Sequence, residues 1–231
     1  GGGLTTSQSF NLAVVTAPVI TALAANVAQA KSGDALTLTA TLSEAVTVTG
    51  TPTLTFDVGG TAMTATYTGG DGTASLTFTA TTSAGDDTSV AVSAFSLGGG
   101  AIMGNVSNQA MVTPVGTAVA SFIIDNSNPV FTSATTANFA ENGTGTAYAT
   151  ATTDATTLVY TKGGADAALF NINSSTGAVS FATAPNFEAP ADVGTDNVYD
   201  ITVTATDALG HASNHNVAIT VTNANEAPTL T

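Results

Sequence analysis

One pattern recurs three times along this chain: a short run of alternating apolar residues, followed a few residues later by a proline. The three copies read SFNLAVVTAPVI, VASFIIDNSNPVF and VAITVTNANEAPTLT. Their prolines, Pro18, Pro129 and Pro228, lie 111 and then 99 residues apart. A repeat of about 100 residues has the length of a small β-sandwich. The pattern therefore predicts tandem domains, each closed by a strand and a proline-marked junction.

Alternation of apolar residues with threonine fills most of the stretch from 18 to 125. ALTLTATL at 35–42 places Leu36, Leu38 and Leu42 on one face and threonines on the other. TLTFDV at 53–58 and TAMTATY at 61–67 flank two glycines and predict a hairpin. SLTFTAT at 75–81 and VAVSAFSL at 90–97 predict further strands, and no segment of ten or more residues keeps a helical period. The fold class expected is all-β.

The composition limits the kinds of molecule that this chain could bind. The 231 residues are enough for two ordinary domains, and no run of about 18 apolar residues predicts a membrane-embedded segment. Sixteen Asp and Glu against two Lys give a net charge of -14. Nucleic acid is therefore excluded, because its binding needs cationic side chains to displace the counterions of the phosphates. A chain this acidic either repels itself or recruits cations.

Two family resemblances follow from these strands. SGDALTLTATLSEAVTVTGTPTLTFDVGGTAMTATY resembles the bacterial Ig-like repeats of large surface proteins in its strand and turn pattern. ALFNINSSTGAVSF and NFEAPADVGTDNVYDITVTATDALGH resemble the cadherin-like repeat of the bacterial kind, and this second likeness covers all of 126–224. Four aromatic residues are expected in the core of that repeat or at its edge: Tyr160, Phe170, Phe181 and Tyr199.

The expected organisation has four parts. Residues 1–17 hold an orphan strand and a linker, which are either the end of an upstream repeat or a donor strand. An Ig-like sandwich follows at 18–125 and a cadherin-like sandwich at 126–224. Residues 225–231 begin another junction.

The cadherin resemblance implies Ca²⁺ bound by carboxylate, amide and backbone oxygens where one repeat meets the next. Residues matching the family's motifs form two groups, one for each end of the second domain. The group at its N-terminal end comprises Asp125, Asn126, Asn128, Asp154 and Asp207. The group at its C-terminal end comprises Glu141, Glu188, Asn223, Asn225 and Glu226.

Three departures from the family pattern weaken this implication. The DxD motif has become TTDAT, in which Asp154 is the one carboxylate, and the DYE motif has become NFE, with Asn186 in place of its Asp. Asn223 stands in the final linker where an Asp is usual. Fewer charges imply weaker sites or fewer ions at each junction.

Other polar residues are expected to serve the fold. Asp71, Asp86 and Asp87 are predicted to form turns. DVGTDN at 192–197 is either an ion-binding loop or a solvated one, and the solvated loop is favoured. On an extended strand His211 and His215 lie roughly 13 Å apart, too far to share one metal ion, and both are expected at the surface.

The expected function is that of a non-catalytic structural or adhesive module with calcium-stiffened junctions, on a secreted or surface-displayed bacterial protein. No serine elbow or histidine triad indicates an enzyme, and no Trp is present to stack on sugars. Expected partners are neighbouring repeats or identical protomers, and a surface receptor or glycan. Two alternatives stay open: a filament or surface-layer subunit joined by a donated strand around Phe10 to Val15, and a carbohydrate-binding module.

Overall fold

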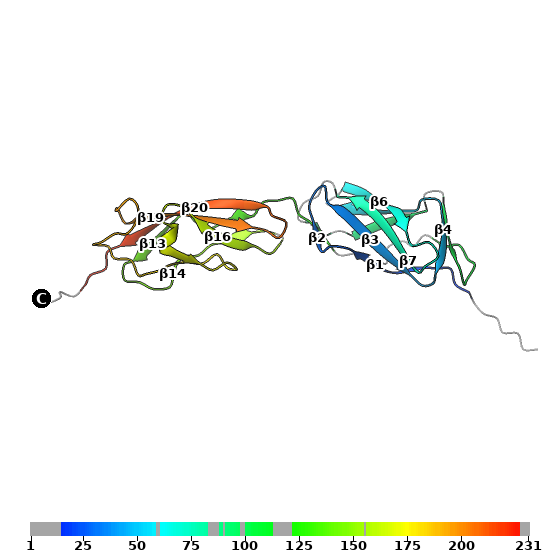
Figure 1. Cartoon of the computed structure of the whole chain (residues 1–231), viewed down its shortest axis with the longest axis horizontal. Helices are drawn as coiled ribbons and strands as arrows, with labels where there is room; N and C mark the ends of the chain where they lie inside the picture. The colour runs from blue at the N-terminus through cyan, green and yellow to red at the C-terminus, as the bar shows by residue number, and fades with distance from the viewer. Residues whose placement is uncertain are drawn as a thin grey trace, which may run out of the picture. The chain divides into compact units, whose positions relative to one another are not determined.

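The computed structural model describes residues 15–58, 61–82, 88–89, 91–97, 100–112, 122–154 and 156–226. The chain divides into two compact units between Ile124 and Asp125, one residue before the expected domain boundary. Each unit is built almost wholly from strands (Figure 1). The expected donor strand before Val15, and Pro228 with its junction, lie outside the described residues.

Unit 1 (residues 1–124) contains three sheets. The largest is a six-stranded antiparallel sheet in the order β1-β3-β7-β6-β5-β9, and the others have the orders β10-β4 and β2-β11-β8. The strands are β1 (Ile20–Ala25), β2 (Gln29–Ala30), β3 (Ala35–Leu42), β4 (Val46–Thr49), β5 (Thr53–Val58), β6 (Thr61–Gly69), β7 (Ser75–Thr81), β8 (Thr88–Ser89), β9 (Ala91–Ser96), β10 (Ala101–Gly104) and β11 (Ile123–Ile124).

The core of unit 1 follows the predicted alternation. Leu36, Leu38 and Leu42 of β3 are buried, while the threonines between them face outward. Leu38 stands opposite Phe78 of β7, and both join one apolar cluster. The predicted strands at 35–42, 53–58 and 75–81 are confirmed with those bounds, and β5 pairs with β6 as the predicted hairpin requires.

Unit 2 (residues 125–231) is a β-sandwich with its own core. A four-stranded sheet in the order β13-β20-β19-β16 faces a three-stranded sheet, β14-β18-β17, and β12 pairs with β15. Its elements are β12 (Val130–Phe131), β13 (Thr136–Ala140), β14 (Thr146–Tyr148), β15 (Thr152–Thr153), β16 (Val159–Gly163), the 3₁₀ turn η1 (Ala167–Leu169), β17 (Phe170–Ile172), β18 (Val179–Phe181), β19 (Val198–Thr206) and β20 (Ala212–Thr222).

Aromatic rings fill the middle of unit 2. Phe170 and Tyr199 are each 1% exposed, and their ring centroids lie 5.9 Å apart in an edge-on arrangement. Phe181 packs against both rings, and Tyr160 is also buried. The four aromatic residues predicted for this core are therefore confirmed there.

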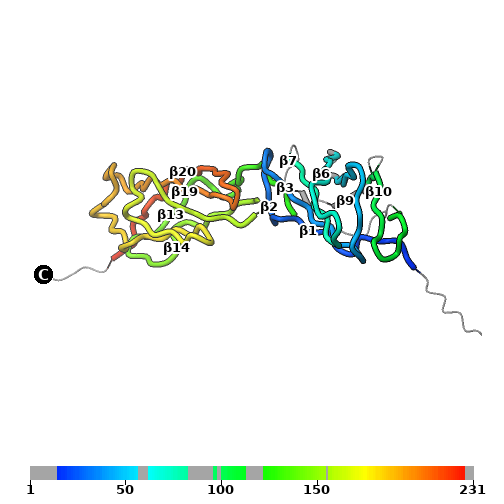
Figure 2. Tube along the Cα trace, turned by 45° about the vertical axis from the view of Figure 1, so that its right-hand side comes forward, coloured from blue at the N-terminus to red at the C-terminus, as the bar shows by residue number. Residues whose placement is uncertain are grey.

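Two strand pairings fix the ends of unit 2. β19 and β20 form a hairpin that closes at the pair Thr206↔Ala212, so residues 207–211 turn at one end of the sheet. β13 runs parallel to β20, and its last pair, Ala140↔Thr222, brings Glu141 beside the chain that leaves β20 at the other end. Figure 2 traces these three strands lying together in unit 2. The two groups of polar residues singled out from the sequence lie at these ends.

Candidate metal centre

Asp207 shapes the turn between β19 and β20. Its Oδ1 accepts hydrogen bonds from the backbone N–H groups of Leu209 and His211, both at 2.8 Å. Gly210 lies between them at φ +89°, a left-handed conformation that glycine adopts without strain. The turn therefore folds the chain back, so that the side chain of His211 meets that of Asp207.

The His211 ring is fixed against the Asp207 carboxylate. Nδ1 of His211 lies 2.7 Å from Oδ2 of Asp207, and the Asp207 side chain is fully buried while that of His211 is 20% exposed. Burial alone would raise the pKa of Asp207, but hydrogen bonds from the ring and backbone of His211 and from the backbone of Leu209 outweigh it. The pKa of Asp207 is therefore below its usual value, and Asp207 is an anion at neutral pH.

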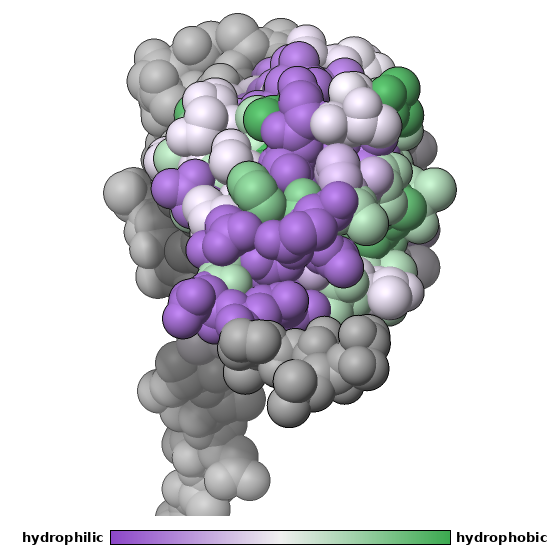
Figure 3. Space-filling model, turned by 90° about the vertical axis from the view of Figure 1, so that its left-hand side faces the viewer, coloured by the Kyte–Doolittle hydropathy of each residue, from purple (hydrophilic) through white to green (hydrophobic). Residues whose placement is uncertain are grey.

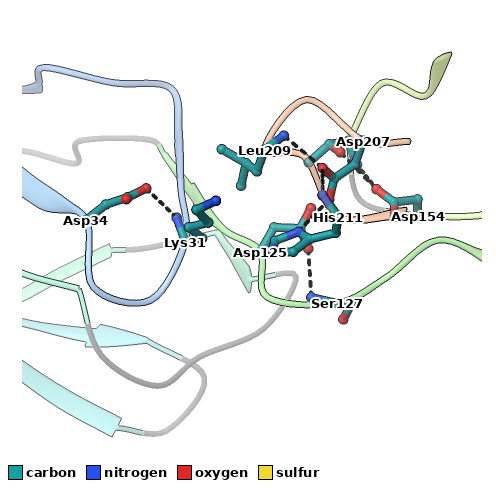
Figure 4. A network of polar contacts seen from close by, with 9 residues as sticks. Lys31, Asp34, Asp125, Ser127, Asp154, Asp207, Leu209 and His211 are labelled. Atoms are coloured by element: carbon teal, nitrogen blue, oxygen red, sulfur yellow. Dashed lines mark hydrogen bonds and ion pairs between the residues drawn. The ribbon is translucent and has the colours of Figure 1, made fainter. Parts of the chain in front are cut away.

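Asp125 brings a second buried carboxylate to the same place. It is the first residue of unit 2 and is 0% exposed, and its Oδ1 accepts a hydrogen bond from the Ser127 N–H at 3.1 Å. One ligand atom each from Asp125, Asp207 and His211 lie within 4.8 Å of one another, and Figure 4 shows the three side chains converging. A cation between two buried carboxyl groups this close would offset the cost of burying their charge.

Asp154 stands next to this group. It follows β15, and its Oδ1 accepts hydrogen bonds from the N–H and hydroxyl of Thr156 at 2.8 and 2.9 Å. Its Oδ2 is shielded from solvent and makes no hydrogen bond. Figure 4 shows the carboxyl group turned toward Asp207, although Asp154 is not one of the three residues that meet within 4.8 Å. A buried carboxylate oxygen without a donor is a natural ligand for a cation.

Of the two linker asparagines, Asn126 is half-buried and Asn128 is exposed. We name the set Asp125, Asp154, Asp207 and His211 the entry cluster, because Asp125 begins unit 2.

The opposite end of unit 2 is organised by Glu141. Its two carboxylate oxygens accept hydrogen bonds from the N–H of Ala224 at 2.8 Å and of Phe187 at 2.9 Å. These bonds, opposed by burial and helped by Glu188, hold the pKa of Glu141 below its usual value. One side chain thereby joins the end of β13 to the 187 loop and to the chain after β20.

Neighbouring polar residues extend this end. Asn223 donates a hydrogen bond to Glu188 at 2.8 Å, Asn142 donates one to Glu226, and Asn225 is exposed. Figure 3, which views unit 2 from this side, shows mainly hydrophilic residues in the described surface. We name the set Glu141, Glu188, Asn223 and Glu226 the exit cluster. Its carboxylates already have hydrogen-bond donors from the protein, so its demand for a cation is weaker than that of the entry cluster.

Several functional residues were not foreseen from the sequence. Both histidines were expected at the surface, and both are partly exposed. Their contacts were not foreseen: His211 bonds to Asp207, and His215 stacks on Phe131 at 4.7 Å with its Nε2 3.1 Å from the Ala134 carbonyl. The signal for His211 was its position four residues after Asp207, just behind the turn glycine. The spacing along the strand was weighed only between His211 and His215, whereas the partner of His211 lies on the other side of the turn.

Residues 193–196 of the loop at 192–197 are exposed, as a solvated loop requires, but its first carboxylate is buried. Asp192 is 3% exposed, and its carboxylate accepts the N–H groups of Asp196 at 3.0 Å and Asn197 at 3.1 Å. Asp166, which no motif marked, is equally buried and accepts the N–H groups of Val193 and Asp200. These two carboxylates hold the backbone of the loop in place. Asp71, expected to form a turn, also accepts a hydrogen bond from the Val48 N–H at 2.7 Å.

Comparisons with known proteins give only weak matches to this chain. No protein-family model and no curated protein matches the sequence. Solved structures of similar shape include human protocadherin-24 EC1-2, at 13% identity and TM-score 0.39 over 92% of this chain and all of that one. Drosophila N-cadherin EC1-4 matches at 17% identity and TM-score 0.37 over 90% of this chain and 51% of that one. Mouse cadherin-23 EC22-24 matches at 13% identity and TM-score 0.37 over 88% and 65%.

The chain thus spans about half the length of the N-cadherin fragment. With TM-scores this low, the matches carry no inference about function. In the part of the chain that the structure describes, no helix is long and apolar enough to cross a membrane.

Proposed function

We propose that this chain is a non-catalytic structural or adhesive module of a secreted or surface-displayed bacterial protein, and that Ca²⁺ bound at the entry cluster restrains the passage between its two units. The observation that carries the proposal is the meeting of the buried carboxyl groups of Asp125 and Asp207 with His211, whose ligand atoms lie within 4.8 Å of one another. A divalent cation offsets both charges at once, which an imidazole cannot do.

The available ligands suit a hard cation in part. Ca²⁺ takes about six to eight oxygens. Asp125, Asp207 and the Oδ2 of Asp154 supply carboxylates, and water or backbone carbonyls must supply the rest. This incomplete set favours a weak site rather than a tight one, in line with the loss of the second Asp from the DxD motif.

The restraint follows from the place of Asp125 in the chain. Ile124, the residue before it, is buried in the core of unit 1 as the last residue of β11, and Asp125 is buried in unit 2. An ion held by Asp125 and Asp207 ties the start of unit 2 to the β19–β20 turn. The start of unit 2 then loses freedom, which would make a row of such modules stiffer.

Surface display rests on other features of the sequence. The two Lys and the absence of Arg leave few points for trypsin-like proteases, and the stretches quoted above resemble repeats of bacterial surface proteins. Partners would be neighbouring repeats, identical protomers, or a receptor or glycan on another surface. Assembly through a donated strand stays a prediction, because residues 1–14 lie outside the described residues.

Calorimetric titration of the metal-stripped protein with Ca²⁺, with thermal melts before and after, tests the proposal. We expect one binding event and a Tm for unit 2 raised by several degrees, because a ligand that binds only the folded state stabilises it. Asp207→Asn keeps Oδ1 as the acceptor of the turn and should remove most of the gain. Asp200→Asn is the matched control, since Asp200 is an exposed acid on β19, the strand that leads to Asp207.

Equal Ca²⁺ binding by the wild type and by both Asp207→Asn and Asp125→Asn would overturn the assignment of the ion to the entry cluster. Unchanged melts and no heat in the wild type would remove calcium from the proposal altogether.

A further inference from the structure

The entry cluster contains a donor that does not belong in a calcium site. Ca²⁺ is a hard cation that is bound by oxygen, whereas His211 presents a nitrogen. The ring nitrogen Nδ1 lies 2.7 Å from Asp207 Oδ2. The backbone N–H of His211 also donates a hydrogen bond to Asp207 Oδ1 at 2.8 Å. The backbone and the ring of His211 therefore both contact the Asp207 carboxylate.

The spacing of the three donors also admits a smaller ion. In a tetrahedral site with bonds of about 2.1 Å, donor atoms lie roughly 3.4 Å apart. The ligand atoms of Asp125, Asp207 and His211 already lie within 4.8 Å of one another, with the closest pair at 2.7 Å. The Oδ2 of Asp154, buried and without a hydrogen-bond donor, is placed to become a fourth ligand.

The chemistry of the set is that of a transition-metal site. Imidazole with carboxylates suits Zn²⁺ and its first-row neighbours, and affinities of such sites for these ions exceed those for alkaline-earth ions. Asp207 and Asp125 are buried, so their two charges match a divalent ion in surroundings that strengthen the attraction. In the neutral imidazole a metal ion at Nδ1 takes the place of the proton between Nδ1 and Oδ2, and Nε2 carries the ring proton instead.

We infer that the entry cluster is a mixed nitrogen and oxygen site that binds a divalent transition-metal ion of the Zn²⁺ class, with His211, Asp207 and Asp125 as ligands, in competition with Ca²⁺. The inference rests on the proposal that this end of unit 2 holds a cation, and it adds which ion the donors prefer. Zn²⁺ recruits His211, whereas Ca²⁺ uses the carboxylates and leaves the imidazole aside.

His215 offers a matched control, because it is the only other histidine of the chain. Its ring stacks on Phe131 and its Nε2 faces the Ala134 carbonyl, so it is not in the entry cluster. His211→Asn and His215→Asn therefore remove the same kind of side chain from different places.

The experiment titrates the metal-stripped full chain with Zn²⁺ alone, with Ca²⁺ alone and with Zn²⁺ against a Ca²⁺ background, for the wild type and both variants. We expect one Zn²⁺ per chain, bound more tightly than Ca²⁺. His211→Asn should lose tenfold or more of the Zn²⁺ affinity (of order 10–100-fold) and keep its Ca²⁺ affinity, while His215→Asn keeps both. Far-ultraviolet circular dichroism of each variant checks that it is folded.

The outcomes separate the two ideas. Ca²⁺ binding with Zn²⁺ binding that is unaffected by His211→Asn overturns the mixed site and leaves the calcium proposal standing. Zn²⁺ binding that depends on His211, without Ca²⁺ binding, supports the mixed site and overturns the calcium proposal. Zn²⁺ binding that falls equally in both histidine variants, or no binding of either ion, overturns the mixed site.

Discussion

At the scale of the residue, two carboxylates of this chain accept hydrogen bonds from backbone N–H groups that lie far away in the sequence. Glu44 accepts the N–H groups of Val106 at 2.8 Å and Ser107 at 2.9 Å, and Glu141 joins Phe187 and Ala224 in the same way. With only two Lys and no Arg in the sequence, few carboxylates can be stabilised by salt bridges to these residues. A carboxylate that accepts two N–H groups is stabilised as an anion, so these contacts depend on pH.

Glu44 gives a pH test outside the metal centre. Hydrogen bonds from the side chain and backbone of Ser107 hold its pKa below its ordinary value of 4.5, against burial, which raises it. A pKa lowered by folding means that the contribution to stability is full above the unfolded pKa and is lost as pH falls through the folded pKa.

We therefore expect Glu44→Gln to lower the Tm of unit 1 at pH 7 and to cost progressively less below pH 4.5. Thermal melts of wild type and variant from pH 7 to pH 3 make the comparison. A difference in Tm that stays constant over this range would show that the charge of Glu44 is not what stabilises the contact.

At the scale of the element, burial on alternate positions decides where the strands lie. β3 buries Leu36, Leu38 and Leu42 and turns its threonines outward, and each of these leucines belongs to the core of unit 1. The same two-residue period runs through β19, where Tyr199, Ile201 and Val203 are buried. Shifting either strand by one residue would expose its whole apolar face.

Leu38→Ala measures this directly. Leu38 is 0% exposed, so its truncation should cost about 2–5 kcal/mol of the free energy of unfolding of unit 1. Thr37→Ala, on the opposite face of the same strand, should stay within about 0.5–1 kcal/mol of the wild type. Chemical denaturation provides both values, and equal losses would contradict the assignment of the two faces.

How far the sequence predicts the molecule depends on the range of the contacts. Strands such as β3 and β7 could be placed by their bounds because their period is local. Asp125 and Asp207 were grouped through the family resemblance, but His211 was set aside because its spacing was weighed only against His215 along the strand and not against Asp207 across the turn. Asp166 had no signal at all, since its partners Val193 and Asp200 lie 27 and 34 residues away.

At the scale of the whole molecule, the chain carries two cores that share no residue. One contains the leucines of β3 with Phe56, Phe78 and Phe122, and the other is built around Phe170 and Tyr199. Each unit buries enough apolar surface to fold on its own account. The molecule should therefore unfold in two steps rather than one.

Differential scanning calorimetry of the full chain checks this expectation. We expect two transitions, with Leu38→Ala lowering only one and Tyr199→Ala lowering only the other. The addition of Ca²⁺ or Zn²⁺ should raise the transition that Tyr199→Ala lowers. A single transition that both substitutions shift together would contradict independent units.

The parallel pairing of β13 with β20 has a consequence for a protein under tension. β13 is the first strand of the four-stranded sheet in chain order and β20 is the last, and five residue pairs join them from Thr136↔Ala218 to Ala140↔Thr222. A pull on the chain before and after unit 2 draws parallel neighbours in opposite directions, which loads their hydrogen bonds in shear. Bonds loaded in this way must break at the same time. Unit 2 should therefore resist extension more strongly than a sheet whose hydrogen bonds can break one after another.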